Sequence, residues 1–122
     1  MAIDPRGADL AAFLASDVDG PVVMLNLLRY ADGGREQYQQ YVDAFRATFA
    51  PRYGVDVIYA GDGDTALVAE DGQQWDAVLL VRYPSRQAFS QMVRDPEYQQ
   101  ITHLRSSALV EAVLQPTIPW DR

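Results

Sequence analysis

Two spacings of apolar residues divide the chain into strands and helices. Residues 22–29 and 75–83 are short, nearly continuous apolar runs bounded by turn residues, which predicts two strands. Residues 35–53 repeat tyrosine, valine and phenylalanine at helical spacing and are followed by Gly54, which predicts a long amphipathic helix with a glycine stop. A further run at 55–61, followed by a turn of glycine and aspartate, predicts a third strand.

Shorter patterns account for most of the remaining chain. Ser85 and Asp95 are good helix N-caps, and Pro96 suits the first helical position, so two helices are expected to begin there. Pro116 lies in the last apolar run and indicates a strand at a sheet edge. The predicted elements are a short helix at 9–17, a short strand at 65–70, helices at 86–94 and 96–109, and a final strand at 110–118.

The order of these elements is strand, helix, strand, short strand, strand, two helices and strand. This order is typical of the ferredoxin-like fold. We therefore predict an α+β protein whose antiparallel sheet carries its helices on one face. With 122 residues, the chain fits a single domain, 1–122, in which the short helix at 9–17 precedes the first strand.

The strands at 22–29 and 75–83 are apolar on both faces, although helices can cover only one face of such a sheet. A face left to water would alternate with polar residues, so a second layer is expected to cover it. At this chain length a second copy of the protein is the economical choice, which predicts a homodimer. We assign the contact to the strand faces that carry Met24, Leu28, Val78 and Leu80.

Two polar residues, Asn26 and Arg82, each interrupt a strand face that is otherwise apolar. A polar group that is buried without a partner costs about 1–3 kcal/mol or more, so each of them needs one. One alternative is internal: Asn26 bonds a neighbouring backbone group, and Arg82 pairs with an acid such as Asp76 or Glu70. The other is that both line a cavity between the sheet and its partner and orient a small ligand there. The apolar wall of such a cavity would include Met24, Leu28 and Leu80.

Arg105 lies on the helix stripe of Tyr98, Ile101 and Ala108, which is expected to face the interior. Its guanidinium either forms a salt bridge to an acid or a helix end, or holds a carboxylate or enolate oxygen of a ligand. Tyr98 is correspondingly either a core tyrosine with its hydroxyl at the surface or a second donor to that ligand.

Composition narrows the classes of function. A net charge of −7, with ten scattered arginines and no lysine, argues against a nucleic-acid partner. There is no membrane-length apolar run and no secretion signal at the N-terminus, so we expect a cytoplasmic protein that does not bind a membrane. The chain has no cysteine, and its single histidine, His103, falls on the polar side of its helix, so neither a metal site nor another cofactor is expected. The sequence GDGD at 61–64 is interpreted as a turn, because it lacks the remaining ligands of a calcium loop.

Three motifs carry a resemblance to a known family: GPVVMLNLLRY, WDAVLLVRYPS and MVRDPEYQQITHLRSSAL. From about Gly20 to Leu114 the chain resembles a domain-of-unknown-function family in the dimeric α+β barrel superfamily. The resemblance implies a ferredoxin-like fold, two sheets joined face to face into a barrel, and Asn26, Tyr98 and Arg105 as recurrent positions. It also implies that the helix at 9–17 is an extension found in the longer members. Relatives in the superfamily include cofactor-independent monooxygenases, heme-degrading enzymes and muconolactone isomerases.

Our leading hypothesis is a homodimeric barrel that binds a small organic ligand between sheet and helices. It would act on an anionic or aromatic substrate without a cofactor, as an oxygenase or isomerase. Asn26, Tyr98 and Arg105 are the candidate catalytic residues, with Arg105 and Tyr98 stabilising developing negative charge. The candidate substrate-binding residues are Arg82, Met24, Leu28 and Leu80. The alternative hypothesis is a dimer that binds a ligand without catalysis or has a structural role.

Overall fold

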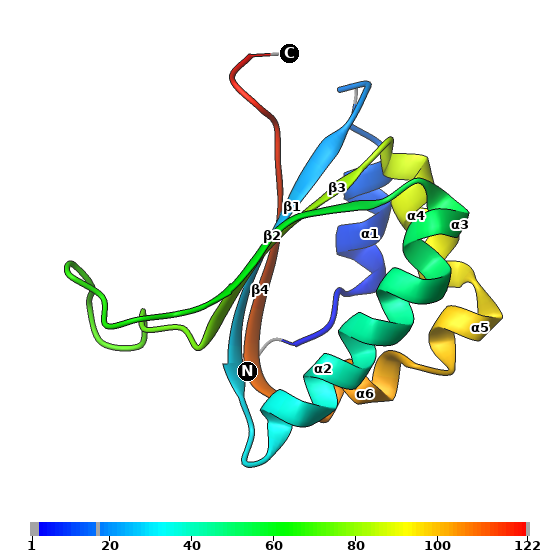
Figure 1. Cartoon of the computed structure of the whole chain (residues 1–122). Coiled ribbons are helices and arrows are strands. Elements are labelled where there is room, and N and C mark those ends of the chain that lie inside the picture. Colours follow the sequence, from blue (N-terminus) through cyan, green and yellow to red (C-terminus); the bar gives the residue numbers. More distant parts are fainter. Residues whose placement is uncertain (1–2, 17, 122) are drawn as a thin grey trace.

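A four-stranded antiparallel sheet carries all of the helices on one face (Figure 1). The computed structural model describes residues 3–16 and 18–121. The strand order is β2-β3-β1-β4, and each neighbouring pair is antiparallel. The predicted ferredoxin-like α+β fold is thereby confirmed. The strands are β1 (Val22–Tyr30), β2 (Asp56–Asp62), β3 (Ala77–Tyr83) and β4 (Leu109–Thr117).

The helices begin where the capping residues predict, but two of them are less regular than expected. The long helix after β1 contains a π-helical turn, η1, between two α-helical parts, and Gly54 ends it with φ 67°. The helix predicted at 96–109 is wrong in its length, because it breaks at Gln100 and Ile101, and β4 already begins at Leu109. The helices are α1 (Gly7–Leu14), α2 (Gly34–Ala44), η1 (Phe45–Phe49), α3 (Ala50–Tyr53), α4 (Arg86–Arg94), α5 (Pro96–Gln99) and α6 (Thr102–Ser106).

The strand predicted at 65–70 is wrong. Residues 63–76 instead form a loop that projects beyond the sheet between β2 and β3 (Figure 1). Side-chain hydrogen bonds of Gln74 to the backbone of Ala66 and Asp64 hold this loop, and none of the four strands pairs with it. Leu67 is 99% exposed.

The core lies between the sheet and the helices, and the strand register decides which residues enter it. Residues opposite each other in an antiparallel pair share a face, and Asn26 pairs with Leu79. The face of β1 that carries Met24 and Leu28 is therefore buried under the helices, and the assignment of these two residues to the dimer contact is wrong. The buried aromatic partners on the helices are Tyr38, Tyr41, Phe45, Phe49, Phe89 and Tyr98.

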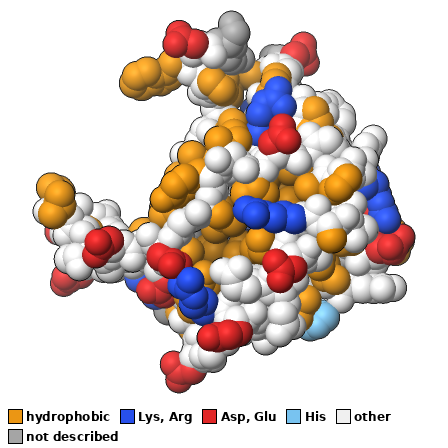
Figure 2. Space-filling view, in the orientation of Figure 1, with side chains coloured by type: hydrophobic (Ala, Val, Ile, Leu, Met, Phe, Trp, Pro, Cys, Tyr) orange, Lys and Arg blue, Asp and Glu red, His pale blue; other side chains and the backbone are white. Residues whose placement is uncertain are grey.

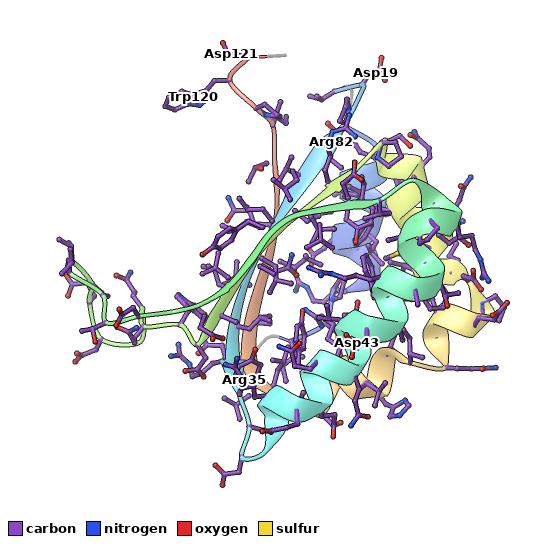
Figure 3. All side chains as sticks on the ribbon, in the orientation of Figure 1. Asp19, Arg35, Asp43, Arg82, Trp120 and Asp121 are labelled. Carbon is purple, nitrogen blue, oxygen red and sulfur yellow. The ribbon has the colours of Figure 1, made fainter. Side chains whose placement is uncertain are left out.

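The opposite face of the sheet has no helix over it. It carries the half-buried apolar side chains Val23, Leu25, Leu27, Val78 and Leu80. Tyr59 of β2, which pairs with Leu80, is 54% exposed on the same face. Apolar side chains also lie on the projecting loop and on the C-terminal segment, where Trp120 stands clear of the molecule (Figure 2, Figure 3). We refer to this side of the sheet as the open face.

Gly34, at the start of α2, provides a test of the packing between α2 and the chain that enters β4. It is buried, and a Cβ there would overlap the carbonyl of Ala108, which already accepts a hydrogen bond from Ala31 N at 2.8 Å. We expect Gly34→Ala to destabilise the protein by about 1–3 kcal/mol, since neither backbone segment can yield freely. Urea unfolding at a fixed protein concentration measures the change.

The matched control is Gly7→Ala in α1, where an added Cβ meets nothing within 4 Å. It should be neutral or stabilise by roughly 0.5–1 kcal/mol, because alanine is the better helix former. A Gly34→Ala variant as stable as its Gly7→Ala counterpart would contradict the close approach.

Candidate functional site

A cavity of about 300 Å³ lies between the sheet and the helices. Three of the residues singled out in the sequence, Asn26, Tyr98 and Arg105, line it together. They come from β1, α5 and α6, which are brought together only when the helices pack on the sheet. The other lining residues include Asp4, Pro5 and Leu10 from the N-terminal segment and Tyr41, Tyr83, Phe89, Ser106 and Leu114.

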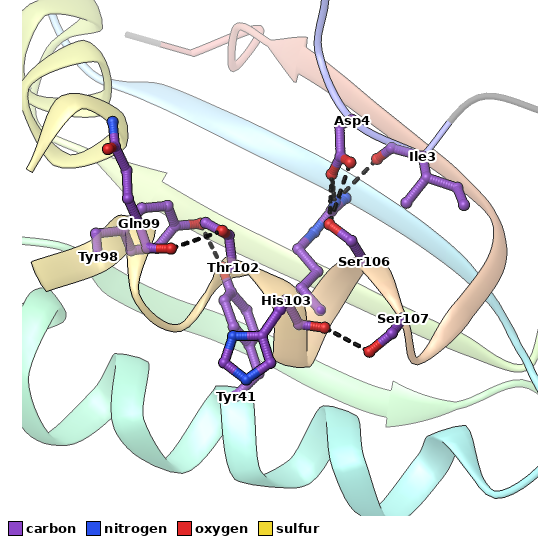
Figure 4. Close-up of polar contacts among 10 residues, drawn as sticks. Ile3, Asp4, Tyr41, Tyr98, Gln99, Thr102, His103, Ser106 and Ser107 are labelled. Atoms are coloured by element: carbon purple, nitrogen blue, oxygen red, sulfur yellow. Dashed lines mark hydrogen bonds and ion pairs between the residues drawn. The ribbon is translucent and has the colours of Figure 1, made fainter. Parts of the chain in front are cut away.

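Arg105 is 7% exposed and is held by the N-terminal segment. Its Nη1 donates to the carbonyl of Ile3 at 2.9 Å and to Asp4 Oδ1 at 3.0 Å (Figure 4). Ser106 Oγ donates to the same carboxylate at 3.0 Å. Asp4 itself is a surface group, with 58% of its side chain exposed. The other terminal nitrogen of Arg105, Nη2, is buried and has no hydrogen-bond partner among the described residues.

The salt-bridge alternative for Arg105 is therefore realised, but only in part. Among the described residues, the buried guanidinium has one acidic partner, Asp4, which is exposed and contacts Nη1 alone. A carboxylate is thus already seen to fit against Arg105 and Ser106, and the two N–H groups of Nη2 are unused.

Tyr98 and Tyr41 form a buried pair beside Arg105, with their hydroxyl oxygens 2.6 Å apart. The expectation that the Tyr98 hydroxyl reaches the surface is wrong. Burial raises the pKa of both phenols above the usual value, so both are neutral at physiological pH. Two neutral hydroxyls share one hydrogen bond, which leaves one proton free for a further acceptor.

Asn26 is 8% exposed, and its Nδ2 donates to the carbonyl of Met24 at a long 3.3 Å. The internal backbone partner that the sequence allowed is therefore present. Next to this amide, Tyr38, Tyr41 and Tyr83 surround a further cavity of about 40 Å³, large enough for a water molecule. Asn26 and Tyr83 are thus the polar residues on the sheet side of this space, and Tyr38 and Tyr41 border it from α2.

The remaining predicted site residues are not brought to this cavity. Arg82 and Leu80 lie on the open face, and Arg82 Nη1 is 3.8 Å from Asp56 Oδ2 rather than near Asp76 or Glu70. Met24 borders a neighbouring cavity, and Leu28 is fully buried in the core. Arg82 pairs with Val23, and Val23 and Asn26 point to opposite faces of β1 because strand residues alternate. Asn26 and Arg82 therefore cannot share a site in one protomer.

Three polar residues of the cavity, Asp4, Tyr41 and Ser106, are not among the site residues predicted from the sequence. The available signal for Tyr41 was a hydroxyl placed on the same buried stripe as Phe45 and Phe49, where phenylalanine would have sufficed. For Asp4 there was no signal, since 101 positions separate it from Arg105.

A second buried arginine, Arg86, also holds the N-terminal segment. Its Nη1 donates to the carbonyl of Phe13 at 3.2 Å, and its guanidinium lies 4.5 Å from the Phe13 ring centroid. The segment from Ile3 to Leu14 therefore covers the cavity and is fixed near both of its ends. α1 belongs to this cover, which gives the predicted helical extension a place in the site.

A polar cleft of about 260 Å³ lies elsewhere, between α2 and β2. Arg35 and Asp43 of α2 line it with Arg46 and Asp62, and Arg35 pairs with Asp62 (Figure 3). Within the described part of the chain, no cluster of three or more histidine, aspartate or glutamate residues is arranged to hold a metal ion. Among residues 3–16 and 18–121, no helix combines the length and the apolar character needed to cross a bilayer.

Comparison with known proteins places the chain in a family. RPA0582, a protein of unknown function from Rhodopseudomonas palustris, has a solved structure that is 32% identical in sequence. That match covers 98% of this chain and 98% of the other, with a TM-score of 0.86. No curated protein matches the chain significantly.

Less similar solved structures share the fold alone. A dimeric ferredoxin-like protein of unknown function from Jannaschia sp. CCS1 is 11% identical, over 82% of this chain and 100% of that one, with a TM-score of 0.62. A putative antibiotic biosynthesis monooxygenase from Bacteroides thetaiotaomicron is 19% identical, over 82% of this chain and 90% of that one, with a TM-score of 0.60. Residues 29–115 match the sequence pattern of a domain of unknown function, DUF1330, and the chain therefore belongs to this family, as its motifs predicted.

Proposed function

We propose that the protein binds a small organic acid in the cavity between the sheet and the helices, with the acid's carboxylate on Arg105. The observation that carries this proposal is a buried guanidinium that lines the cavity. Among residues 3–16 and 18–121, its Nη2 has no hydrogen-bond partner and its one acidic partner is an exposed carboxylate. Arginine pairs with carboxylates through two parallel hydrogen bonds when the geometry allows.

In this proposal the Asp4 carboxylate occupies the position that a ligand carboxylate takes. An ion pair with a largely exposed partner contributes only about 0–1 kcal/mol, so Asp4 is readily displaced. Because Nη2 is buried, the side chains around it have to move for a ligand to use both nitrogens, and Asp4 has to leave Nη1. Ser106, which donates to Asp4, would then donate to the ligand.

The other end of the same cavity suits a second oxygen atom of the ligand. The free proton of the Tyr41–Tyr98 pair is a donor, and the Asn26 amide supports both donation and acceptance. Leu10, Phe89 and Leu114 supply apolar wall, and Gln99 and Thr102 add further polar groups. Such a mixture of an apolar pocket and a few convergent polar groups is typical of sites for small molecules.

The first test of the proposal is Arg105→Met, which keeps the length of the side chain and removes its charge. We expect hexanoate binding, measured by isothermal titration calorimetry, to weaken at least about tenfold, since a charge-assisted hydrogen bond is lost. The fold should survive, because apolar replacement of a buried ion pair is often tolerated. Asp4→Asn should instead tighten binding by up to about fivefold, because it removes the competing carboxylate.

The control is Arg46→Met, which removes an arginine from the cleft between α2 and β2. It should leave hexanoate binding unchanged. If Arg46→Met abolishes binding while Arg105→Met does not, the acid binds in that cleft and the proposed site is wrong.

A second candidate function, a cofactor-independent enzyme of the oxygenase or isomerase type, is favoured by the neutral Tyr41–Tyr98 pair. A hydroxyl that donates to a carbonyl oxygen stabilises the enolate formed when a neighbouring carbon loses its proton. Among the described lining residues of the cavity, Asp4 is the one carboxylate able to accept that proton. The monooxygenase-like neighbour from Bacteroides thetaiotaomicron agrees with this chemistry only at the level of the fold.

The catalytic candidate predicts that the protein speeds enolisation of acetoacetate in heavy water, followed as deuterium incorporation by proton NMR. Tyr98→Phe should slow this exchange roughly a hundredfold without weakening acetoacetate binding, as expected for loss of a proton donor. Tyr59→Phe, on the open face, is the control. Exchange at the spontaneous rate in the wild type, with acetoacetate bound, would leave binding as the function.

We further propose that two copies associate through their open faces to form the α+β barrel. The support is the row of half-buried apolar side chains on a sheet face without helices. Solved relatives of this fold from Jannaschia sp. CCS1, Thermobifida fusca and Bacteroides fragilis are described as dimeric. Leu80, opposite Leu25 and Tyr59, lies in the middle of this face.

Leu80→Asp should convert the dimer to a monomer of 13.6 kDa in light scattering, because a carboxylate at the centre of the contact would be buried without a partner. Ala47→Asp, an equal change of charge at an exposed helical position, should leave the dimer intact. A wild-type monomer at micromolar concentration would rule out the assembly, and a fully stable dimer of Leu80→Asp would show that another face is used.

A further inference from the structure

A second cavity, of about 360 Å³, adjoins the first beneath α1. The two share four lining residues, Pro5, Leu10, Phe89 and Leu114. We infer that the bound acid carries an unbranched apolar tail, and that this tail lies in the second cavity while the carboxylate lies on Arg105. This inference rests on the proposed function and specifies its class of ligand.

The second cavity is lined mainly by apolar side chains, which is why an apolar tail fits it, and each of its three polar residues has a contact within the protein. Arg86 donates to the Phe13 carbonyl and stacks on the Phe13 ring. Asp9 forms a bidentate pair with Arg6, at 2.7 and 3.0 Å. Ser16 Oγ accepts from Val18 N. Arg86 has no acidic partner among the described residues, so a dicarboxylate is the competing class of ligand. Met24 and Pro116 extend the apolar wall.

The boundary between the two cavities is built from three sides. Leu10 comes from α1, Phe89 from α4 and Leu114 from β4. Phe89 is fixed, because its ring makes edge-to-face contacts with Tyr83 on the side of the first cavity and with Phe13 on the side of the second. Leu10 is only partly buried and belongs to the segment that Asp4 attaches to Arg105. Displacement of Asp4 by a carboxylate therefore frees the side of the boundary that a tail has to pass.

A chain-length series tests the inference with the intact protein. Calorimetric titration with butanoate, hexanoate and octanoate should show an affinity that rises about fourfold for each added methylene, the value for transfer of that group out of water. Ala12→Phe places a ring over the second cavity from an exposed helical position. It should preserve butanoate affinity and remove most of the gain for octanoate.

The matched control is Ala11→Phe, the same change at the preceding position of α1, which borders another groove with Val93 and Arg94 and lines neither of the two cavities. It should follow the wild-type series. Equal affinity of the wild type for all three acids, or identical behaviour of the two phenylalanine variants, would overturn the inference while leaving carboxylate binding intact. Suberate binding more tightly than octanoate would also overturn it, because a second carboxylate would then have a partner. Failure of all acids to bind would instead contradict the proposed function.

Discussion

β1 lies between β3 and β4 and pairs with both in antiparallel register. Asn26 stands opposite Leu79 on one side and Leu114 on the other, so these three side chains share the face that the helices cover. A slip of one residue would move Asn26 and the fully buried Leu28 to the open face and bring Leu25 and Leu27 under the helices. A single pairing thus positions the polar floor of the cavity and, at the same time, leaves an apolar surface suited to a second copy.

Local sequence signals predicted most of the fold, because its elements obey local rules. Ser85 and Asp95 cap their helices as expected, accepting hydrogen bonds from Ala88 N and Glu97 N. The failures depend on non-local structure. The apolar residues at 65–70 can form a strand only beside a partner strand, and β1 does not reach them. The π-helical turn at Phe45–Phe49 and the break at Ile101 adjust helices to the packing of the core, which local periodicity does not encode.

For the candidate site, too, local sequence signals predicted individual residues but not their partners from distant parts of the chain. Asn26 and Arg105 were predicted because each is polar in an apolar pattern, and burial of a polar group demands a partner. Tyr98 was predicted because it lies on the helix stripe of Arg105. Arg82 met the same criterion as Asn26 but lies on the other face. The sequence shows which residues of one strand share a face. Which residues of two different strands share a face depends on the register in which the strands pair. The partner of Arg105 was out of reach for a further reason: nothing local relates Asp4 to a helix near the other end of the chain.

The two buried arginines, Arg86 and Arg105, hold the N-terminal segment over the cavity. A purely apolar contact would hold the N-terminal segment without competing with a ligand. Arg105 and Arg86 instead donate to carbonyls near the two ends of the segment. Of these two arginines, Arg105 is the one that lines the first cavity. A carboxylate that takes both nitrogens of Arg105 must therefore displace Asp4. Its binding free energy is then the difference between its own contact with Arg105 and the contact that Asp4 loses. The attachment through Arg86 and Phe13 is outside this competition, so in the proposed mode of binding it holds α1 near the sheet when the Asp4 contact is lost.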